Sequence, residues 1–325
     1  MTDDRGQSAW HGEAALPFQV PALDLRGRLI RLGPSLDIMI ERHNYPPAVA
    51  ELLAEAMTLA ATLASSIKYD GIFTLQIRGD GPVRLLVTDV TSSGQMRGYA
   101  QFDRARLEAA LGEGAPDIST VPRLLGAGTL AFTVDQGPDT ERYQGVVALE
   151  GATLAECAQG YFKQSEQLKT GLRLAVSRQA NGAGEGHAHW RGAALMIQRL
   201  PGELTVDGFS DDSDEADERW RVAIIKLSTT TDKEMLDAKL PGEQLLYRLY
   251  HEEGVHASPP RHLQFGCRCS RQRIENVLRS FPKEEIADLK DDSGDIVVTC
   301  EFCLTEYRLD DAQVEALWAG KKDHK

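Results

Sequence analysis

The chain carries two closely spaced cysteine pairs near its C-terminus, in the stretches Phe265-Gly-Cys-Arg-Cys-Ser270 and Cys300-Glu-Phe-Cys303. The chain has 325 residues and only five cysteines. Zinc takes four soft ligands in a tetrahedron, and a Cys-x-x-Cys turn places two thiolates in one coordination sphere. The pattern therefore predicts a zinc site, with one Zn²⁺ bound by four ligands. These ligands are Cys267, Cys269, Cys300 and Cys303.

The Cys-x-Cys half of this motif is less usual than Cys-x-x-Cys, and it leaves two roles open for the metal. A disulfide between Cys267 and Cys269 would close a small, strained ring of the labile, regulatory kind. Four thiolates on one divalent ion are also electron-rich, and oxidation would remove them as ligands. From chemistry alone the site is either a redox switch or a purely structural zinc site, and the structural role is the commoner one.

The terminal region, residues 264–325, predicts a small zinc-binding domain with little core of its own, which a structural metal would stabilise. Ser270 can cap a helix whose apolar residues fall on one face, and Asp310 or Asp311 can cap a last helix. Asp295–Thr299 and Leu304–Leu309 are typical of short strands on either side of the second cysteine pair. The expected apolar stripe of the first helix consists of Ile274, Val277, Leu278 and Phe281.

Residues 211–263 predict a metastable helical linker. Its first part, Asp211–Glu218, is an acidic run that we expect to be exposed and mobile. Trp220–Leu227 and Leu245–Tyr250 are helix-like and rich in large apolar residues, and Thr231 with Glu234 forms a capping box. The segment is too apolar for a passive spacer, so it must cover another part of the chain or be covered.

Residues 1–210 predict an α+β core domain, with hairpin-connected strands and interspersed helices. Ala48–Ile67 is long and apolar enough for a membrane span, but its glutamates favour a buried core helix. Cys157 falls on the inner face of a predicted helix and is expected to be a buried, unreactive thiol. The expected strands are Ile72–Arg78, Val83–Val90, Gly98–Phe102, Thr129–Asp135, Tyr143–Leu149, Leu172–Ser177 and Ala193–Arg199.

Composition and charge restrict the function. The formal net charge is −13, and from His262 onward 10 Lys and Arg face 13 Asp and Glu, which argues against nucleic-acid and anionic-membrane partners. The N-terminus has no apolar core of a signal peptide, so we expect a cytoplasmic protein. We also expect no enzyme activity, because four cysteines fill the coordination sphere that a catalytic zinc would keep open.

The cysteine signature resembles that of the heat shock protein 33 family, the redox-regulated chaperones. Further stretches in the same order extend the resemblance over most of the chain. One departure is Leu304, which follows the last cysteine where zinc knuckles often carry glycine and leaves open a different local turn. The stretches are His43-Asn-Tyr-Pro46, Arg78-Gly-Asp-Gly-Pro82, Glu141-Arg-Tyr-Gln-Gly-Val-Val147, Tyr161-Phe-Lys-Gln-Ser-Glu-Gln167 and Tyr247-Arg-Leu-Tyr-His-Glu-Glu253.

The resemblance implies an ATP-independent holdase that protects unfolding client proteins from aggregation. In such a protein the reduced, zinc-bound form is inactive, and oxidation releases zinc as the disulfides Cys267–Cys269 and Cys300–Cys303 form. The linker then unfolds and apolar surface captures clients. We expect the oxidised form to be a homodimer. The alternative is a zinc-ribbon protein whose purely structural zinc serves nucleic-acid binding or complex assembly.

Overall fold

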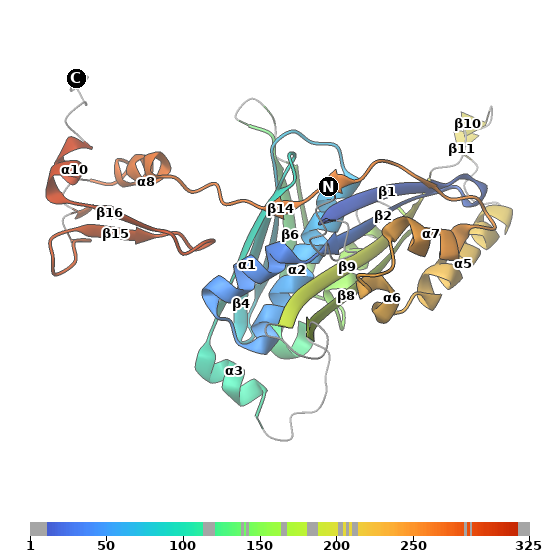
Figure 1. The fold of residues 1–325 in the computed structure, drawn as a ribbon, viewed down its shortest axis with the longest axis horizontal. Helices are drawn as coiled ribbons and strands as arrows, with labels where there is room; N and C mark the ends of the chain where they lie inside the picture. The colour runs from blue at the N-terminus through green and yellow to red at the C-terminus, as the bar shows by residue number, and fades with distance from the viewer. Residues whose placement is uncertain are drawn as a thin grey trace, which may run out of the picture. The chain divides into compact units, whose positions relative to one another are not determined.

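The computed structural model describes residues 12–112, 121–137, 140, 143–163, 168–180, 188–200, 204–205, 208–209, 214–282, 285–286 and 288–317. The chain divides into two compact units, Met1–Phe265 and Gly266–Lys325. Both contain strands and helices, which confirms the predicted α+β class (Figure 1).

The first sheet of unit Met1–Phe265 has the strand order β12-β1-β2-β9-β8, with β13 also paired to β1, and all its pairs are antiparallel. The sequence analysis identified β8 and β9 but missed β1 and β2. The Phe18 ring of β1 lies against Gly27 of β2, where a Cβ would come within 2.1 Å of it. The strands are β1 Ala14–Val20, β2 Leu25–Leu32, β8 Thr170–Ala180, β9 Ala188–Arg199, β12 His256–Ala257 and β13 Arg261–His262.

The second sheet has the order β14-β5-β4-β3-β6-β7, in which β14 is parallel to β5 and the other pairs are antiparallel. Its five longer strands confirm the predicted hairpins to within a few residues. A separate short hairpin joins β10 Leu204–Thr205 to β11 Gly208–Phe209. The strands of the sheet are β3 Ile72–Gly79, β4 Val83–Thr91, β5 Gln95–Phe102, β6 Gly128–Asp135, β7 Tyr143–Ala148 and β14 Gln264–Phe265.

The long helix α2, Pro47–Ser66, contacts strands of both sheets and forms the centre of the core. Among the described residues it is the one helix apolar and long enough to cross a membrane, but most of it is buried within the protein. The buried Thr58 and Thr62 hydroxyls donate to carbonyls one turn earlier, so burying these polar groups costs little free energy. The remaining helices here are η1 Pro21–Leu23, α1 Pro34–His43, α3 Arg104–Ala110, η2 Val121–Leu125 and α4 Leu154–Tyr161.

Three helices from the predicted linker cover the face of the first sheet that points away from α2 (Figure 1). They are α5 Asp214–Thr229, α6 Asp232–Leu236 and α7 Gly242–Tyr250. The predicted capping box of Thr231 and Glu234 begins α6. Fifteen larger apolar residues and three alanines share this second core, and Tyr250 stacks on Phe18 with ring centroids 6.0 Å apart.

The acidic run is only partly as predicted. Its described part begins α5, where carboxylates favour the helix N-terminus, so the expectation of a mobile segment is wrong for residues 214–218. Asp217 accepts from Lys169 at 2.5 Å and from Arg199 at 3.0 Å, and these partners hold it to the sheet. Residues 211–213 lie outside the described residues.

A buried arginine joins the first sheet to the linker. Arg31 of β2 is 9% exposed and donates through Nη1 to the carbonyl of Leu240. Its Nη2 donates to the carbonyl of Glu234 at 3.3 Å. The Glu234 carbonyl belongs to the last turn of α6, where the negative end of the helix dipole favours a cation, and Leu240 lies in the loop that follows.

Within its described residues, unit Gly266–Lys325 has helices α8 and α10 beside a two-stranded antiparallel sheet, close to prediction. Its elements are α8 Arg271–Leu278, β15 Ile296–Thr299, β16 Glu306–Leu309 and α10 Asp311–Ala316. The predicted stripe on the first helix is half wrong, because Ile274 and Leu278 join the core whereas Val277 and Phe281 are 55% and 45% exposed.

Helix α7 allows a test of how the linker is held. Leu246 is fully buried against the first sheet, so Leu246→Ala is expected to lower the free energy of unfolding by about 2–5 kcal/mol. Tyr247 on the same helix is 62% exposed, and Tyr247→Ala should stay within about 0.5 kcal/mol. Denaturant titration of the reduced chain, with proteolysis of residues 214–253, measures both. Equal effects of the two substitutions would contradict the packing described.

Candidate metal centre

Four cysteine sulfurs converge in unit Gly266–Lys325, all within 4.8 Å of one another. The Sγ of Cys267 is 3.4 Å from that of Cys269 and 3.7 Å from that of Cys300. The sulfurs of Cys269 and Cys303 are 3.3 Å apart. A tetrahedral zinc with Zn–S bonds of about 2.3 Å has S–S edges of about 3.8 Å. The donor set therefore fits one tetrahedral, thiolate-binding cation, and it is the set that the sequence predicts.

The second cysteine pair lies on the turn between β15 and β16. The backbone carbonyl of Cys300 accepts from the amide of Cys303 at 3.3 Å and from that of Leu304 at 2.8 Å. The amide of Cys300 donates to the carbonyl of Thr305. Leu304 has φ +55°, in the left-handed region that glycine adopts without cost. The knuckle turn is thus kept, and the absence of glycine costs this chain about 1–2 kcal/mol of backbone strain.

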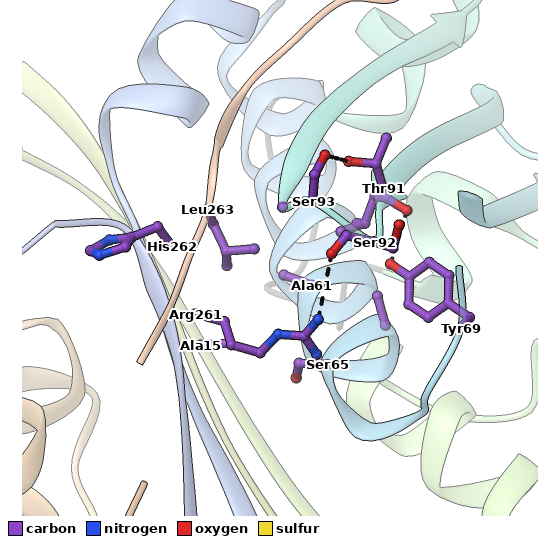
Figure 2. Close-up of a pocket in the computed structure, with 13 residues that line it drawn as sticks. Ala15, Ala61, Ser65, Tyr69, Thr91, Ser92, Ser93, Arg261, His262 and Leu263 are labelled. Carbon is purple, nitrogen blue, oxygen red and sulfur yellow. Dashed lines mark hydrogen bonds between the residues drawn. The ribbon is translucent and has the colours of Figure 1, made fainter. Parts of the chain in front are cut away.

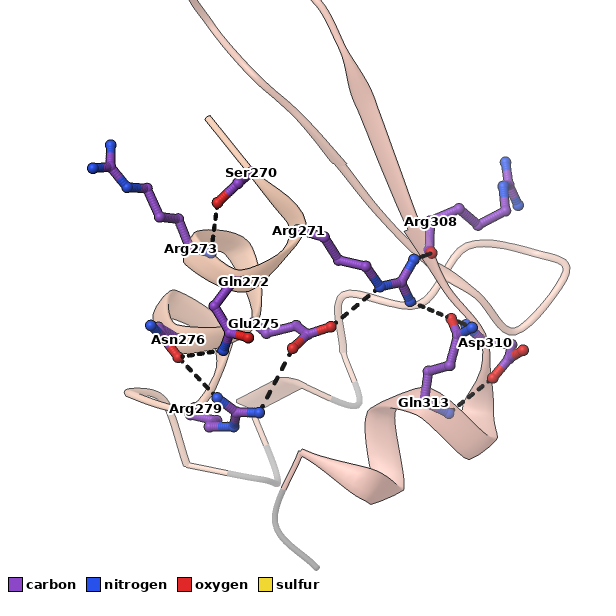
Figure 3. A network of polar contacts seen from close by, with 10 residues as sticks. All are labelled: Ser270, Arg271, Gln272, Arg273, Glu275, Asn276, Arg279, Arg308, Asp310 and Gln313. Carbon is purple, nitrogen blue, oxygen red and sulfur yellow. Dashed lines mark hydrogen bonds and ion pairs between the residues drawn. The ribbon is translucent and has the colours of Figure 1, made fainter. Parts of the chain in front are cut away.

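The first cysteine pair precedes α8 and is positioned by the helix start. Ser270 Oγ accepts from the Arg273 amide at 3.3 Å, and the Arg273 guanidinium donates to the carbonyl of Arg268 at 2.8 Å. Arg271 donates to Glu275 at 3.1 Å and to Gln313 at 2.7 Å (Figure 3). This network ties α8 to α10 and so brings the two halves of the cysteine cluster together.

Two hydroxyl groups contact the sulfurs directly. Tyr307 of β16 donates to Cys269 Sγ at 3.1 Å, and this bond raises the pKa of Tyr307 to about 12. The Thr305 hydroxyl lies 3.2 Å from Cys303 Sγ, where it can donate to a thiolate. Groups of this kind orient ligands and tune a metal site. The sequence analysis missed both residues.

The sulfurs differ in how readily they ionise. Burial, helped by the neighbouring thiols, raises the pKa of Cys269 to about 12, and burial also raises the pKa of Cys300. Burial opposes ionisation of Cys303 as well, but hydrogen bonds from the hydroxyl and the amide of Thr305 lower its pKa to about 6. Cys303 is therefore a thiolate at neutral pH and is the sulfur best prepared to meet a cation.

Cys157 takes no part in this cluster. It is buried in α4 of the other unit, and burial raises its pKa to about 11, as expected of an unreactive thiol. Within the part of the chain that the structure describes, the four cysteines are the one group of three or more His, Cys, Asp or Glu residues close enough to share an ion.

Comparisons with known proteins agree with this geometry. The sequence model of a family described as "Hsp33 protein" matches residues 13–310. A 33 kDa chaperonin of Caulobacter vibrioides is 41% identical over 312 residues, covering 95% of this chain and 99% of that protein. One of Serratia proteamaculans is 36% identical, covering 91% of each. The crystal structure of a 33 kDa chaperonin from Thermotoga maritima shares the fold, with a TM-score of 0.71, 21% identity and coverage of 94% and 98%.

The hydroxyl contacts predict the effect of removing them. Thr305→Val and Tyr307→Phe are each expected to weaken zinc binding about 10–100-fold, because each leaves a thiolate without its donor. Thr299→Val is the matched control, since Thr299 is exposed on β15. Competition with a chromophoric chelator measures the affinities. Parental affinity in both hydroxyl variants would contradict their role at the site.

Zinc binding should also weaken as the pH falls. Cys269 and Cys300, whose pKa values are raised, hold protons at neutral pH and must release them to bind a cation. Each proton that the cation displaces corresponds to about a tenfold loss of affinity per pH unit, so these two thiols alone contribute about 100-fold per unit. Below pH about 6 Cys303 also takes up a proton, which steepens the dependence by a further factor of about ten per unit. Chelator competition at a series of pH values measures the slope, and a constant slope through pH 6 would contradict the assignment of Cys303.

Proposed function

Because the chain belongs to the Hsp33 family, we propose that it is a redox-regulated, ATP-independent holdase. In this proposal the reduced chain holds one Zn²⁺ on Cys267, Cys269, Cys300 and Cys303 and is inactive. Oxidation releases the metal and activates the chain toward unfolding client proteins. The observation that carries the proposal is the convergence of the four cysteine sulfurs. The first of these cysteines, Cys267, follows the end of β14 by two residues.

The metal, when bound, would cross-link two distant segments of a unit whose apolar core is small. In the redox step each pair of thiolates gives up two electrons to a peroxide and forms one S–S bond. Two peroxide molecules accept the four electrons, four protons are taken up, and four waters form. Sulfur atoms in a disulfide carry no negative charge, so they no longer bind a divalent cation.

We propose the pairs Cys267–Cys269 and Cys300–Cys303. The sulfur distances in the reduced cluster suit cross-pairs equally well, since Cys269 and Cys303 are 3.3 Å apart. The local pairs are supported by the family resemblance and by chain connectivity. Residues one or two positions apart stay within reach once the unit loses its fold, whereas partners in opposite halves do not.

The linker is the element that we propose to unfold next. Its helices cover the apolar face formed by Leu16, Phe18, Leu29, Leu195 and Ile197, a surface suited to unfolded chains. We assign residues 1–210 to the core, 211–263 to the linker and 264–325 to the redox domain. Like the named relatives, which are chaperonins, the chain is proposed to have no enzyme activity.

We propose a cytoplasmic location, where thiols stay reduced until oxidative stress, and an oxidised homodimer. The four thiolate ligands, which suit zinc better than harder cations, support zinc as the metal. The net charge of −13 supports clients rather than nucleic acid or anionic membranes as partners.

The test treats the reduced, zinc-loaded chain with peroxide at raised temperature. We expect release of one Zn²⁺ per chain, the two local disulfides in a peptide map, and suppression of a heat-unfolded client's light scattering only after release. Cys157→Ser should behave as the parent, whereas Cys303→Ser should lose the reduced, inactive state. Release of zinc with no gain in suppression would leave a purely structural zinc site and contradict the holdase.

A further inference from the structure

Residues 256–262, here called the edge segment, occupy the outer edge of strand β1. Phe18 pairs with Ala257 and Gln19 with His256, while Ala15 pairs with Arg261. The amide of Ser258 donates to the carbonyl of Pro17 at 2.8 Å. The odd-numbered residues of β1 therefore point their backbone groups toward the edge segment, since a strand alternates its hydrogen-bonding side.

The edge segment fits this edge poorly. Between the pairs Phe18–Ala257 and Ala15–Arg261, β1 has residues 16 and 17, but the segment has residues 258, 259 and 260. The extra residue makes a bulge. Two of the three are Pro259 and Pro260, which have no N–H to donate. Regular pairing is thus confined to the two ends of the segment.

Side chains add little to the hold of the edge segment. His256, Ala257, Arg261 and His262 are all exposed. A pocket of about 170 Å³ lies beside it (Figure 2), and across this pocket the Arg261 guanidinium reaches the carbonyl of Ser92 at 3.4 Å. The backbone bond of Ser258 has an ordinary length, but a segment with exposed side chains and few apolar contacts detaches more readily than one packed in the core.

Strand β1 itself is a good template. It pairs with β2 in register over all seven residues and contains no charged side chain. Unprotected edges of this kind accept added strands, and proteins normally guard them with charges. The opposite edge strand, β8, is guarded by Arg173 and Arg178, whereas β1 carries no charge; its outer edge is covered by the edge segment and lacks one N–H, at Pro17.

We propose that β1 is a strand-addition site for clients. On activation, which this inference takes from the proposed function, the edge segment leaves, and an extended, uncharged, proline-free stretch of the client pairs antiparallel with β1. Its backbone bonds to the amides and carbonyls of Ala15 and Gln19 and donates to the carbonyl of Pro17, which has no N–H. A large apolar side chain replaces Ala257 beside Phe18. Backbone pairing accepts many sequences, which suits a holdase.

The other uncharged edge does not share this property. Within the described strands β7 pairs with β6 alone, and its Tyr143 and Val146 are 50% and 53% exposed. No described strand pairs with the outer edge of β7. This edge is therefore open in the inactive state, and uncovering it cannot account for activation. It serves as an internal control.

Hydrogen exchange on the full-length chain tests the proposal. The Ala15 and Gln19 amides should be protected in the reduced protein and exchange rapidly after oxidation. They should regain protection when reduced, carboxymethylated α-lactalbumin is added as the client. Continued rapid exchange with client bound would overturn the proposal, because binding by the sheet face alone leaves these amides free. Protection without client that grows with chain concentration would indicate a second copy and overturn it too.

A pair of proline substitutions gives an independent readout. Gln19→Pro removes one edge amide from β1, and Gln144→Pro removes the outward amide of β7; both side chains are exposed. Loss of one strand hydrogen bond should weaken client binding by the oxidised chain about five-fold in the first variant and leave the second unchanged. Equal binding by both variants would refute strand addition. No client binding by the oxidised parent would instead refute the proposed function.

Discussion

The small C-terminal unit is built around four sulfur atoms that lie close enough to share one cation. Its buried apolar core consists of Leu278, Ile286, Ile296, Leu309, Val314 and Leu317. A core of this size supplies no more than about 3–5 kcal/mol. Structural zinc on such ligands contributes about 10–16 kcal/mol at neutral pH. A zinc ion bound by the four sulfurs would outweigh this core, so chemistry that consumes the thiolates would then remove most of the free energy that folds the unit.

The cysteine site could be predicted because its information is local. Spacing alone places Cys300 and Cys303 on one turn, and alternation marks the strands on either side. The hydroxyl of Tyr307 reaches Cys269 only because β15 and β16 pair and α8 is tied to α10. That contact depends on tertiary structure, although the short spacing of Thr305 from Cys303 was a signal that could have been used.

The hairpins of the second sheet were predictable for the same local reason, whereas β1 and β2 were not. Arginines fall on both faces of β2, which removes the alternation that identifies a half-buried strand. Arg31 is tolerated on the covered face because two linker carbonyls accept from it. Asp217 is exposed, as the acidic run predicts, but it also pairs with Lys169 and Arg199, which come from other parts of the chain. The environments of Arg31 and Asp217 depend on partners that are distant in the sequence, so the local sequence pattern could not predict them.

The edge segment has to satisfy two opposed requirements. If it matched β1 residue for residue, seven residues of continuous pairing would hold the edge closed whatever happened at the metal site. If it were absent, an uncharged edge would be open to other chains at all times. Pro259 and Pro260 interrupt the pairing, so the two ends of the segment are bonded to β1 independently of each other. The C-terminal end continues through β14 into Cys267, two residues beyond Phe265. The buried Leu263 and the pairing of β14 with β5 lie between the edge segment and Cys267, so loss of order at the cysteines releases the segment only when this anchor also gives way.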